Sequence, residues 1–130
     1  MSIVKGINNV SLHIVKWEEA KRFYSDTLGL GAPSFCDDEF GWCEFGAEGA
    51  THLALNKWND PTPPSREGGG TIVLTVDDCS AAVAALRAKG VRCEDPIGIP
   101  GMVTYAGFWD SDGNRLQLAG PAPAGPAPAG

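Results

Sequence analysis

Residues 7–30 read INNVSLHIVKWEEAKRFYSDTLGL, residues 71–91 read TIVLTVDDCSAAVAALRAKGV, and a shift of 62 positions lays the first stretch on the second. Each stretch opens with alternating apolar and polar residues, which predicts a strand, and continues with apolar residues at helical spacing. Gly29 and Gly90 follow these runs and are expected to end the two helices. The expected buried stripes are Ala20, Phe23, Tyr24, Thr27 and Leu28 in the first helix and Cys79, Val83 and Leu86 in the second.

Short strands are expected after each helix, because glycine, proline and polar turn residues divide the remaining apolar runs. Asp77 or Asp78 is expected to cap the second helix. Residues 110–114, DSDGN, carry the turn residues of a hairpin between the last two strands. The sequence therefore predicts an α+β fold of two βαβββ modules. The expected strands lie at residues 32–36, 41–45 and 51–56 in the first half and at residues 91–95, 102–108 and 115–119 in the second.

Proline and glycine mark the boundaries of these modules. Residues 60–70, DPTPPSREGGG, interrupt the strand pattern, and residues 120–130 repeat GPAPA without a side chain large enough to bury. Such a repeat cannot offset its own ordering entropy, which predicts a flexible tail. We therefore expect one domain over residues 1–119, with a first module at about residues 5–57, a linker at residues 58–70 and a second module at about residues 71–119.

The composition excludes several classes of function. The 130 residues carry 10 Lys and Arg against 16 Asp and Glu, a net charge of −6, so the basic surface of a nucleic-acid binder is absent. No apolar run approaches the roughly 20 residues of a membrane-spanning helix. The first residues, MSIVKGINNV, lack the basic and long apolar regions of a secretory signal, which predicts a cytoplasmic protein.

The cysteine spacing points to no redox motif or zinc motif. Neither a CxxC pair nor a zinc knuckle is present. An even number of cysteines permits two disulfides, whereas a reducing compartment favours buried free thiols. The four are Cys36, Cys43, Cys79 and Cys93.

The two stretches, together with FWDSDGNRLQL at residues 108–118, resemble the vicinal oxygen chelate superfamily, which includes glyoxalase I, extradiol dioxygenases, fosfomycin resistance enzymes and bleomycin resistance proteins. The similar features are the opening strand, the FY-containing helix with its LGL exit, and the closing F-x-D-P-D-G-N hairpin. Lys16 replaces a usual capping Asp, and Ser111 replaces the hairpin proline. The resemblance covers about residues 5–119 and implies curved mixed sheets around a cavity that two subunits of a dimer often complete.

The resemblance also implies where the metal ligands of the family's enzymes would stand. Those positions are a His or Gln on the first strand, a Glu on the fourth, a His on the fifth and a Glu on the last. In this sequence they hold Asn9, Ala54, Thr71 and Gln117. Ala54 has no donor atom, and the other three side chains carry no charge to offset a divalent cation. We therefore predict no metal and no cofactor.

The two histidines leave other possibilities open. Strand alternation places His13 and His52 on the face that looks away from the helix, together with Asn9, Ser11, Ala54 and Asn56. A zinc site of His13, His52 and Glu44 is one hypothesis. The alternatives are that each imidazole hydrogen-bonds a ligand or a neighbouring side chain, or that one acts as a base in proton transfer.

Aromatic residues supply a second set of candidates. Trp42, Trp58 and Trp109 lie in the later strands or their loops, whereas Trp17 begins a helix and is expected to serve packing or an interface. By alternation Tyr105 shares a face with Trp109, and Trp42 with Glu44, whose carboxylate favours a cationic ligand. Two or three rings can hold a flat ligand, since each aromatic contact adds about 0.5 to 1.5 kcal/mol. Their alternative role is in the core or a dimer interface.

The prediction is a metal-free, cytoplasmic, homodimeric protein that binds an aromatic or cationic small molecule and gives antibiotic or natural-product resistance by sequestration. The alternative is a lyase, isomerase or dioxygenase of the same superfamily that uses a non-standard metal site or a His base. No catalytic residue is assigned. The predicted ligand-binding residues are Asn9, His13, Trp42, Glu44, His52, Asn56, Thr71, Tyr105, Trp109 and Gln117.

Overall fold

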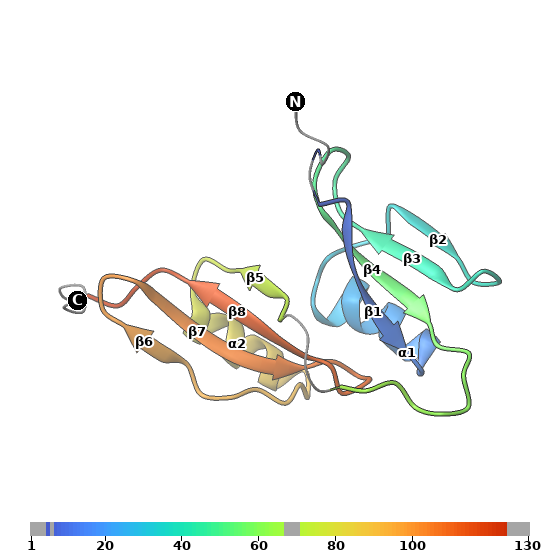
Figure 1. Ribbon diagram of the computed structural model, residues 1–130. Helices are drawn as coiled ribbons and strands as arrows, with labels where there is room; N and C mark the ends of the chain where they lie inside the picture. Colours follow the sequence, from blue (N-terminus) through green and yellow to red (C-terminus); the bar gives the residue numbers. More distant parts are fainter. Residues whose placement is uncertain (1–4, 6, 67–70, 125–130) are drawn as a thin grey trace. The chain divides into compact units, whose positions relative to one another are not determined.

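Two four-stranded sheets with the same strand order make up the protein, β1-β4-β3-β2 and β5-β8-β7-β6 (Figure 1). The structure is a computed structural model that describes residue 5, residues 7–66 and residues 71–124. It divides into a first unit, Met1–Ser65, and a second unit, Arg66–Gly130. The predicted α+β fold of two βαβββ modules is confirmed. Residues 125–130 of the expected flexible tail lie outside the described residues.

Each sheet combines one parallel strand pair with antiparallel pairs. The first unit contains β1 (Asn9–Ile14), α1 (Trp17–Arg22), the π-helical segment η1 (Phe23–Thr27), β2 (Phe35–Asp37), β3 (Trp42–Phe45) and β4 (His52–Lys57). The second unit contains β5 (Val73–Thr75), α2 (Cys79–Ala88), β6 (Ile97–Ile99), β7 (Val103–Trp109) and β8 (Arg115–Gly120).

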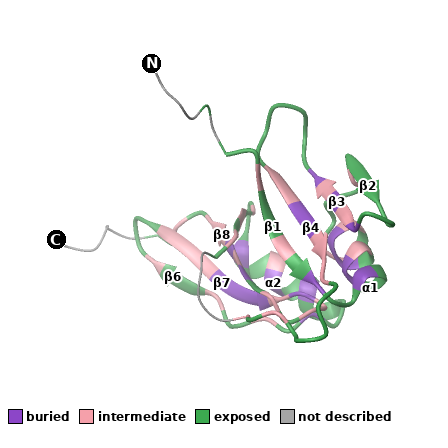
Figure 2. Ribbon diagram, turned by 45° about the vertical axis from the view of Figure 1, so that its right-hand side comes forward, coloured by how far each residue is buried: buried purple, intermediate pink, exposed green. Residues whose placement is uncertain are grey.

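The core of the first unit lies between its helical segments and one face of its sheet (Figure 2). Ala20, Phe23 and Tyr24 of the predicted stripe are buried, and Tyr24 is completely inaccessible to solvent. Burial of a large apolar side chain stabilises a fold by about 1.5 to 3 kcal/mol. Trp17 is also buried and donates from its indole nitrogen to Asp38 at 2.9 Å, as expected for a packing residue.

The first helix differs from its prediction in the last turn, which is π-helical. The amide of Leu28 donates to the carbonyl of Phe23 at 2.7 Å, five residues back. This wider turn shifts the stripe, so Thr27 and Leu28 are only half-buried. Gly29 then ends the helical segment with a φ of +85°, a conformation that glycine adopts without strain.

The second helix follows its prediction closely. The Asp78 carboxylate accepts from the amide of Ala81 at 3.0 Å, so Asp78 is the N-cap, and Gly90 follows the helix with a φ of +85°. The three residues of the predicted stripe, Cys79, Val83 and Leu86, are buried.

Strand bounds are the least accurate part of the sequence prediction. The strand expected at residues 91–95 is wrong, because this segment makes one isolated bridge, between Cys93 and Phe108, and β6 forms instead at Ile97–Ile99. Pro96 has no amide hydrogen and separates the bridge from the strand. The fifth strand begins two residues later than expected, which leaves Thr71 outside β5.

The hairpin between β7 and β8 is held by Asp110, a buried carboxylate. Its two oxygens accept from the amides of Asp112 and Asn114 and from the Asn114 side chain, at 2.8 to 2.9 Å. Arg66, just after the first unit, donates to Asp112 and Asn114 and so ties the linker to this turn. The predicted turn at residues 110–114 is therefore confirmed.

The four cysteines are free thiols, so the alternative with two disulfides is wrong. Cys43 and Cys79 are buried, Cys93 is half-buried and Cys36 is exposed. Within the described ranges, no helix combines the length and the apolar character that crossing a membrane requires.

Candidate ligand-binding site

The six predicted site residues of the first unit lie on the sheet face that looks away from α1, here called the open face. Directly opposed residues of neighbouring strands project to the same side of a sheet. The register pairs Asn9 with His52 and His13 with Asn56 across β1 and β4. It also pairs Trp42 with Asn56 and Glu44 with Ala54 across β3 and β4. This open face therefore carries all six predicted residues of the first unit.

A chain of hydrogen bonds runs across this face. The indole nitrogen of Trp42 donates to Oε2 of Glu44 at 2.8 Å, and Oε1 of Glu44 lies 2.8 Å from Nδ1 of His52. Nε2 of His52 lies 2.8 Å from the carbonyl oxygen of Ala47. Both imidazole nitrogens thus face acceptors, and only the protonated ring can donate to both. The arrangement therefore favours the imidazolium form of His52 beside the carboxylate.

The pKa values agree with this geometry. The Ala47 carbonyl and Glu44 together raise the pKa of His52 above its ordinary value of 6.5. Hydrogen bonds from Trp42 and His52 lower the pKa of Glu44 below its ordinary value of 4.5. The two groups form an ion pair in which 20% of the His52 side chain and 23% of the Glu44 side chain remain exposed.

Gly46 makes this arrangement sterically possible. Its φ is +150°, and a Cβ atom on it would overlap the His52 ring. Glycine is the one residue that offers both the backbone conformation and the space. The role of Gly46 could not be predicted from the sequence, since the contact joins the loop after β3 to the first residue of β4.

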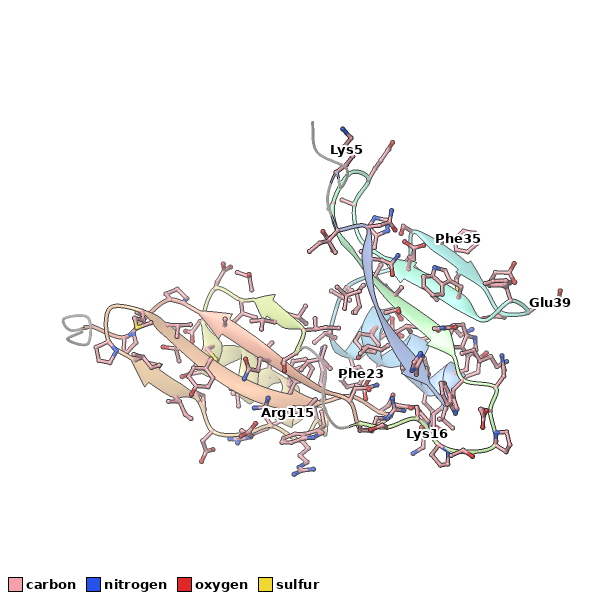
Figure 3. All side chains as sticks on the ribbon, in the orientation of Figure 1. Lys5, Lys16, Phe23, Phe35, Glu39 and Arg115 are labelled. Atoms are coloured by element: carbon pink, nitrogen blue, oxygen red, sulfur yellow. The ribbon has the colours of Figure 1, made fainter. Side chains whose placement is uncertain are left out.

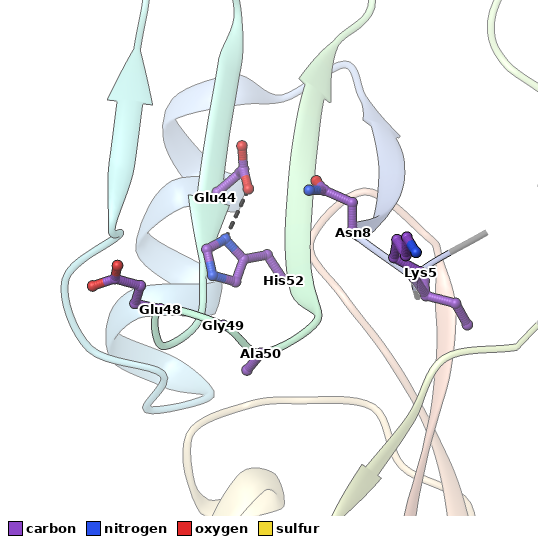
Figure 4. Close-up of a pocket in the computed structure, with 8 residues that line it drawn as sticks. Lys5, Asn8, Glu44, Glu48, Gly49, Ala50 and His52 are labelled. Carbon is purple, nitrogen blue, oxygen red and sulfur yellow. Dashed lines mark hydrogen bonds and ion pairs between the residues drawn. The ribbon is translucent and has the colours of Figure 1, made fainter. Parts of the chain in front are cut away.

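A polar cavity of about 510 Å³ adjoins the ion pair (Figure 4). Glu44 and His52 project into it from β3 and β4, and Glu48 stands in the loop between these strands. Its remaining walls come from the segment before β1 and from the same loop. The lining residues are Lys5, Ile7, Asn8, Glu44, Glu48, Gly49, Ala50 and His52.

An aromatic groove of about 390 Å³ lies on the same sheet, lined by Phe35, Asp37, Phe40 and Trp42. Phe35 projects from the outer strand β2 (Figure 3). It is 53% exposed, and Phe40, in the β2–β3 turn, is 78% exposed. The three aromatic side chains together form an apolar patch, and such patches occur at ligand-binding grooves and protein interfaces. Of these three rings, only Trp42 was predicted from the sequence. Phe40 follows three acidic residues in a turn, a pattern that does not indicate a binding role.

The first-unit histidines do not come together as a metal site. The His13 ring packs against Trp58, with 4.7 Å between ring centroids, and the Trp58 indole donates to the carbonyl of Thr62 at 2.7 Å. Over the part of the chain that the structure describes, no three His, Cys, Asp or Glu side chains are grouped so that they could hold a metal ion. The hypothesis of a zinc site from His13, His52 and Glu44 therefore has no support in this geometry.

In the second unit, Gln117 pairs with Val73 on β5 and with Gly107 on β7. Tyr105 and Trp109 share its sheet face, as alternation predicts. The Trp109 ring has the guanidinium of Arg92 at 3.8 Å and that of Arg115 at 5.8 Å from its centroid, so it is engaged in cation–π contacts. Thr71 is exposed before β5 begins. Ligand binding by these residues stays a prediction.

The donor set at the family's metal positions does not fit a divalent metal. Ala54 is fully buried and has no donor atom. Asn9, Thr71 and Gln117 offer neutral oxygens, whereas metal sites in proteins use thiolate, imidazole or carboxylate ligands to hold such a charge. No step of a reaction is therefore derived through a metal at these positions.

Comparisons with known proteins agree with the fold. A sequence profile of the Glyoxalase/Bleomycin resistance protein/Dioxygenase superfamily matches residues 6–118. TnmS3, an antibiotic binding protein from Streptomyces sp. CB03234, is 30% identical over 94% of this chain and 100% of its own, with a TM-score of 0.72. A glyoxalase/bleomycin resistance protein from the same organism is 30% identical over 87% of this chain and 98% of its own, with a TM-score of 0.60.

Enzymes of this fold are also similar in structure. Lactoylglutathione lyase from Agrobacterium tumefaciens is 19% identical over 92% of this chain and 96% of its own, with a TM-score of 0.69, a likeness that concerns the fold alone. No curated protein sequence matches the chain.

Proposed function

Because the chain belongs to the glyoxalase/bleomycin resistance protein/dioxygenase superfamily, we propose that it binds a planar aromatic small molecule and protects against it by sequestration. The observation that carries the proposal is the aromatic groove, where Phe35 and Phe40 stand exposed beside Trp42. A flat ligand in this groove would cover three rings at once. Each ring contact contributes about 0.5 to 1.5 kcal/mol beyond the burial of apolar surface.

The similarity to TnmS3 supports an antibiotic or related natural product as the ligand. The Asp37 carboxylate at the groove favours a ligand with a positive charge or a hydrogen-bond donor. We propose that the protein acts in the cytoplasm as a homodimer without a metal, and that residues of the second unit, including Tyr105, Trp109 and Gln117, also contribute to ligand binding.

Of the two histidines that could serve an enzyme as a base, the geometry weighs against His52. A general base needs a free lone pair within reach of a substrate proton. Both nitrogens of His52 lie 2.8 Å from acceptors, an arrangement that favours the protonated ring, which has no free lone pair. A purified protein with stoichiometric bound metal, whose removal abolishes ligand binding, would overturn the metal-free proposal.

The proposal is tested by a thermal-shift screen against planar aromatic antibiotics, followed by titration of tryptophan fluorescence. When the free ligand concentration is 100 times its Kd, the ligand stabilises the folded protein by about 2.7 kcal/mol. Phe40→Ala should weaken binding about 2- to 10-fold, since one aromatic contact is lost. Phe40 is 78% exposed, so its removal should leave the fold intact.

Met102→Ala is the matched control, because Met102 is 64% exposed in the corresponding β6–β7 turn of the second unit. Its Kd should equal that of the unaltered protein. Equal Kd values for the Phe40 and Met102 variants would place the ligand outside the groove, and no stabilisation by any aromatic compound would overturn the proposal.

A further inference from the structure

We infer that the polar cavity is the second half of one ligand site, and that it takes an uncharged, hydroxyl-rich substituent, such as a sugar, carried by the aromatic ligand. The inference rests on the proposed function and specifies the class of ligand. It follows from how the cavity joins the aromatic groove, from the charges that line it, and from the bonds that fix the wall between the two.

The aromatic groove and the polar cavity share a wall on the open face of the first unit. Phe35 of the aromatic groove is the cross-strand partner of Glu44 of the polar cavity. Directly opposed side chains have Cβ atoms about 4.5 to 5.5 Å apart. Trp42, also in the groove, donates its indole hydrogen to the same Glu44. A molecule bound on the aromatic side therefore has its edge next to the cavity, within reach of a single covalent linkage.

The charges in the cavity compensate one another. The Glu44 carboxylate is paired with the His52 imidazolium, which leaves Glu48 and Lys5 as the other charged groups of the lining. Figure 4 shows Glu48 and Lys5 on opposite sides of the cavity. An ionic substituent of either sign would meet one like and one opposite charge there, so the lining gives neither sign a net preference.

Hydroxyl groups fit this lining better than a charge does. The Glu48 carboxylate only accepts hydrogen bonds and the Lys5 ammonium only donates them, whereas a hydroxyl does both. Asn8 adds a side-chain amide, which accepts from Asn9 through its oxygen and keeps its own donors. A polyhydroxylated group can therefore satisfy both ends of the cavity without burying an unpaired charge.

The wall between the aromatic groove and the polar cavity is held in place before any ligand binds. Trp42, Glu44 and His52 are linked by two hydrogen bonds of 2.8 Å, and His52 is further tied to the Ala47 carbonyl at 2.8 Å. Gly46 lets the imidazole lie against the backbone. A preorganised wall reduces the entropy cost of binding a rigid ligand, which suits a fused aromatic glycoside.

The test uses pairs of compounds that differ only in the sugar: a flavonol, an anthraquinone and a naphthol, each as the aglycone and as its O-glucoside. Affinities are measured by tryptophan fluorescence for the unaltered chain and for Glu48→Gln, Lys5→Gln and Phe40→Ala. Glu39→Gln is the matched control, since Glu39 is an exposed carboxylate in the β2–β3 turn and outside the cavity lining.

At least one glucoside should bind more tightly than its aglycone. Glu48→Gln and Lys5→Gln should each lower the affinity for the glucoside about 2- to 10-fold, the effect of one hydrogen bond. The affinity for the aglycone should be unchanged in both variants. Phe40→Ala should lower the affinity for both compounds, whereas Glu39→Gln should change the affinity for neither.

Equal binding of glucoside and aglycone, with no effect of the two cavity variants, would overturn this inference and leave the proposed function standing. Failure of every aglycone and glucoside to bind would overturn both.

Discussion

Replacing Gly46 by alanine should destabilise the first unit and release His52 from its two acceptors. A Cβ atom at this position would lie 3.0 Å from Cγ and 3.2 Å from Nε2 of the His52 ring, with a still closer contact at Cδ2. The backbone φ of +150° adds conformational strain, which costs on the order of 1 to 3 kcal/mol for a residue with a side chain. The ring must therefore move, and its bonds to Glu44 and Ala47 are lost.

Gly49→Ala provides the matched control in the same loop. Gly49 has a φ of +81°, and a Cβ atom on it would have nothing within 4 Å. This variant carries only the backbone penalty of about 1 to 2 kcal/mol. Any extra loss of stability in Gly46→Ala, beyond the difference between the two backbone penalties, reports the displacement of His52.

The extra loss should depend on pH in a defined direction. The folded-state pKa of His52 is raised above 6.5, so its stabilising effect is complete below pH 6.5 and is lost as pH rises through the folded-state value. The folded-state pKa of Glu44 is lowered below 4.5, so its effect is complete above pH 4.5 and is lost as pH falls through the lowered value. Both effects are present together between pH 4.5 and pH 6.5.

The assay is urea unfolding of both variants at pH 5.5 and pH 9, combined with an NMR titration of the His52 ring. The difference between Gly46→Ala and Gly49→Ala should be larger at pH 5.5. The His52 pKa should fall toward 6.5 in Gly46→Ala and remain raised in Gly49→Ala. An unchanged His52 pKa in Gly46→Ala, or a difference in stability that is the same at both pH values, would refute the reasoning.

Two further predictions concern the second helix and the thiols. Asp78→Ala should lower the free energy of unfolding by about 0.5 to 2 kcal/mol in urea titrations, because the N-cap bond is lost; a loss just as large in Asp77→Ala would contradict this assignment of the cap. Iodoacetamide at pH 8 should modify the exposed Cys36 before Cys43, as followed by mass spectrometry, because burial and the neighbouring Cys36 raise the pKa of Cys43 to about 12. Equal rates for these two thiols in the folded protein would show that Cys43 is accessible.

The elements that could be predicted from the sequence are those that one local rule governs. In the second helix the capping aspartate, the apolar stripe and the terminal glycine all indicate the same helix. Its cap and its buried residues are as expected. The first helix has a similar stripe, but its last turn widens into a π-helix around Phe23 and Tyr24, both buried. Local spacing cannot predict such a turn, since it depends on how these two rings pack against the sheet.

In the candidate site, too, features set by the local backbone could be predicted, whereas contacts between separate elements could not. Alternation along a strand is a property of the backbone, so the sequence places Trp42, Glu44 and His52 on one face correctly. Phe40 could not be found in this way, because it lies in a turn and has no alternating partner. Phe35 lies on β2 opposite Glu44, but the pairing of β2 with β3 is needed to place it on this face. Their role depends on the distance between side chains of different elements, which a single sequence does not contain.

The duplication gives this site a counterpart in the second unit. In the strands after the helices the shift between the two units is 63 instead of 62. It places Gly107 at the position of Glu44, in agreement with the registers, since Glu44 pairs with Ala54 and Gly107 pairs with Gln117. The same shift lays His52 on Arg115, and each is the first residue of the last strand in its unit. The two units therefore place a side chain that can carry a positive charge at the same point of the sheet.

Each of these cations pairs with a glutamate beside a glycine that has no room for a side chain. His52 pairs with Glu44 where the Gly46 backbone leaves space for the ring, and Arg115 pairs with Glu94 above Gly107. An arginine stays protonated at every pH that a folded protein meets, whereas a histidine loses its charge near neutrality. Of these two ion pairs, only the one in the first unit loses its positive charge as the pH rises through the raised pKa of His52, so an effect of this charge on ligand affinity should disappear in the same pH range.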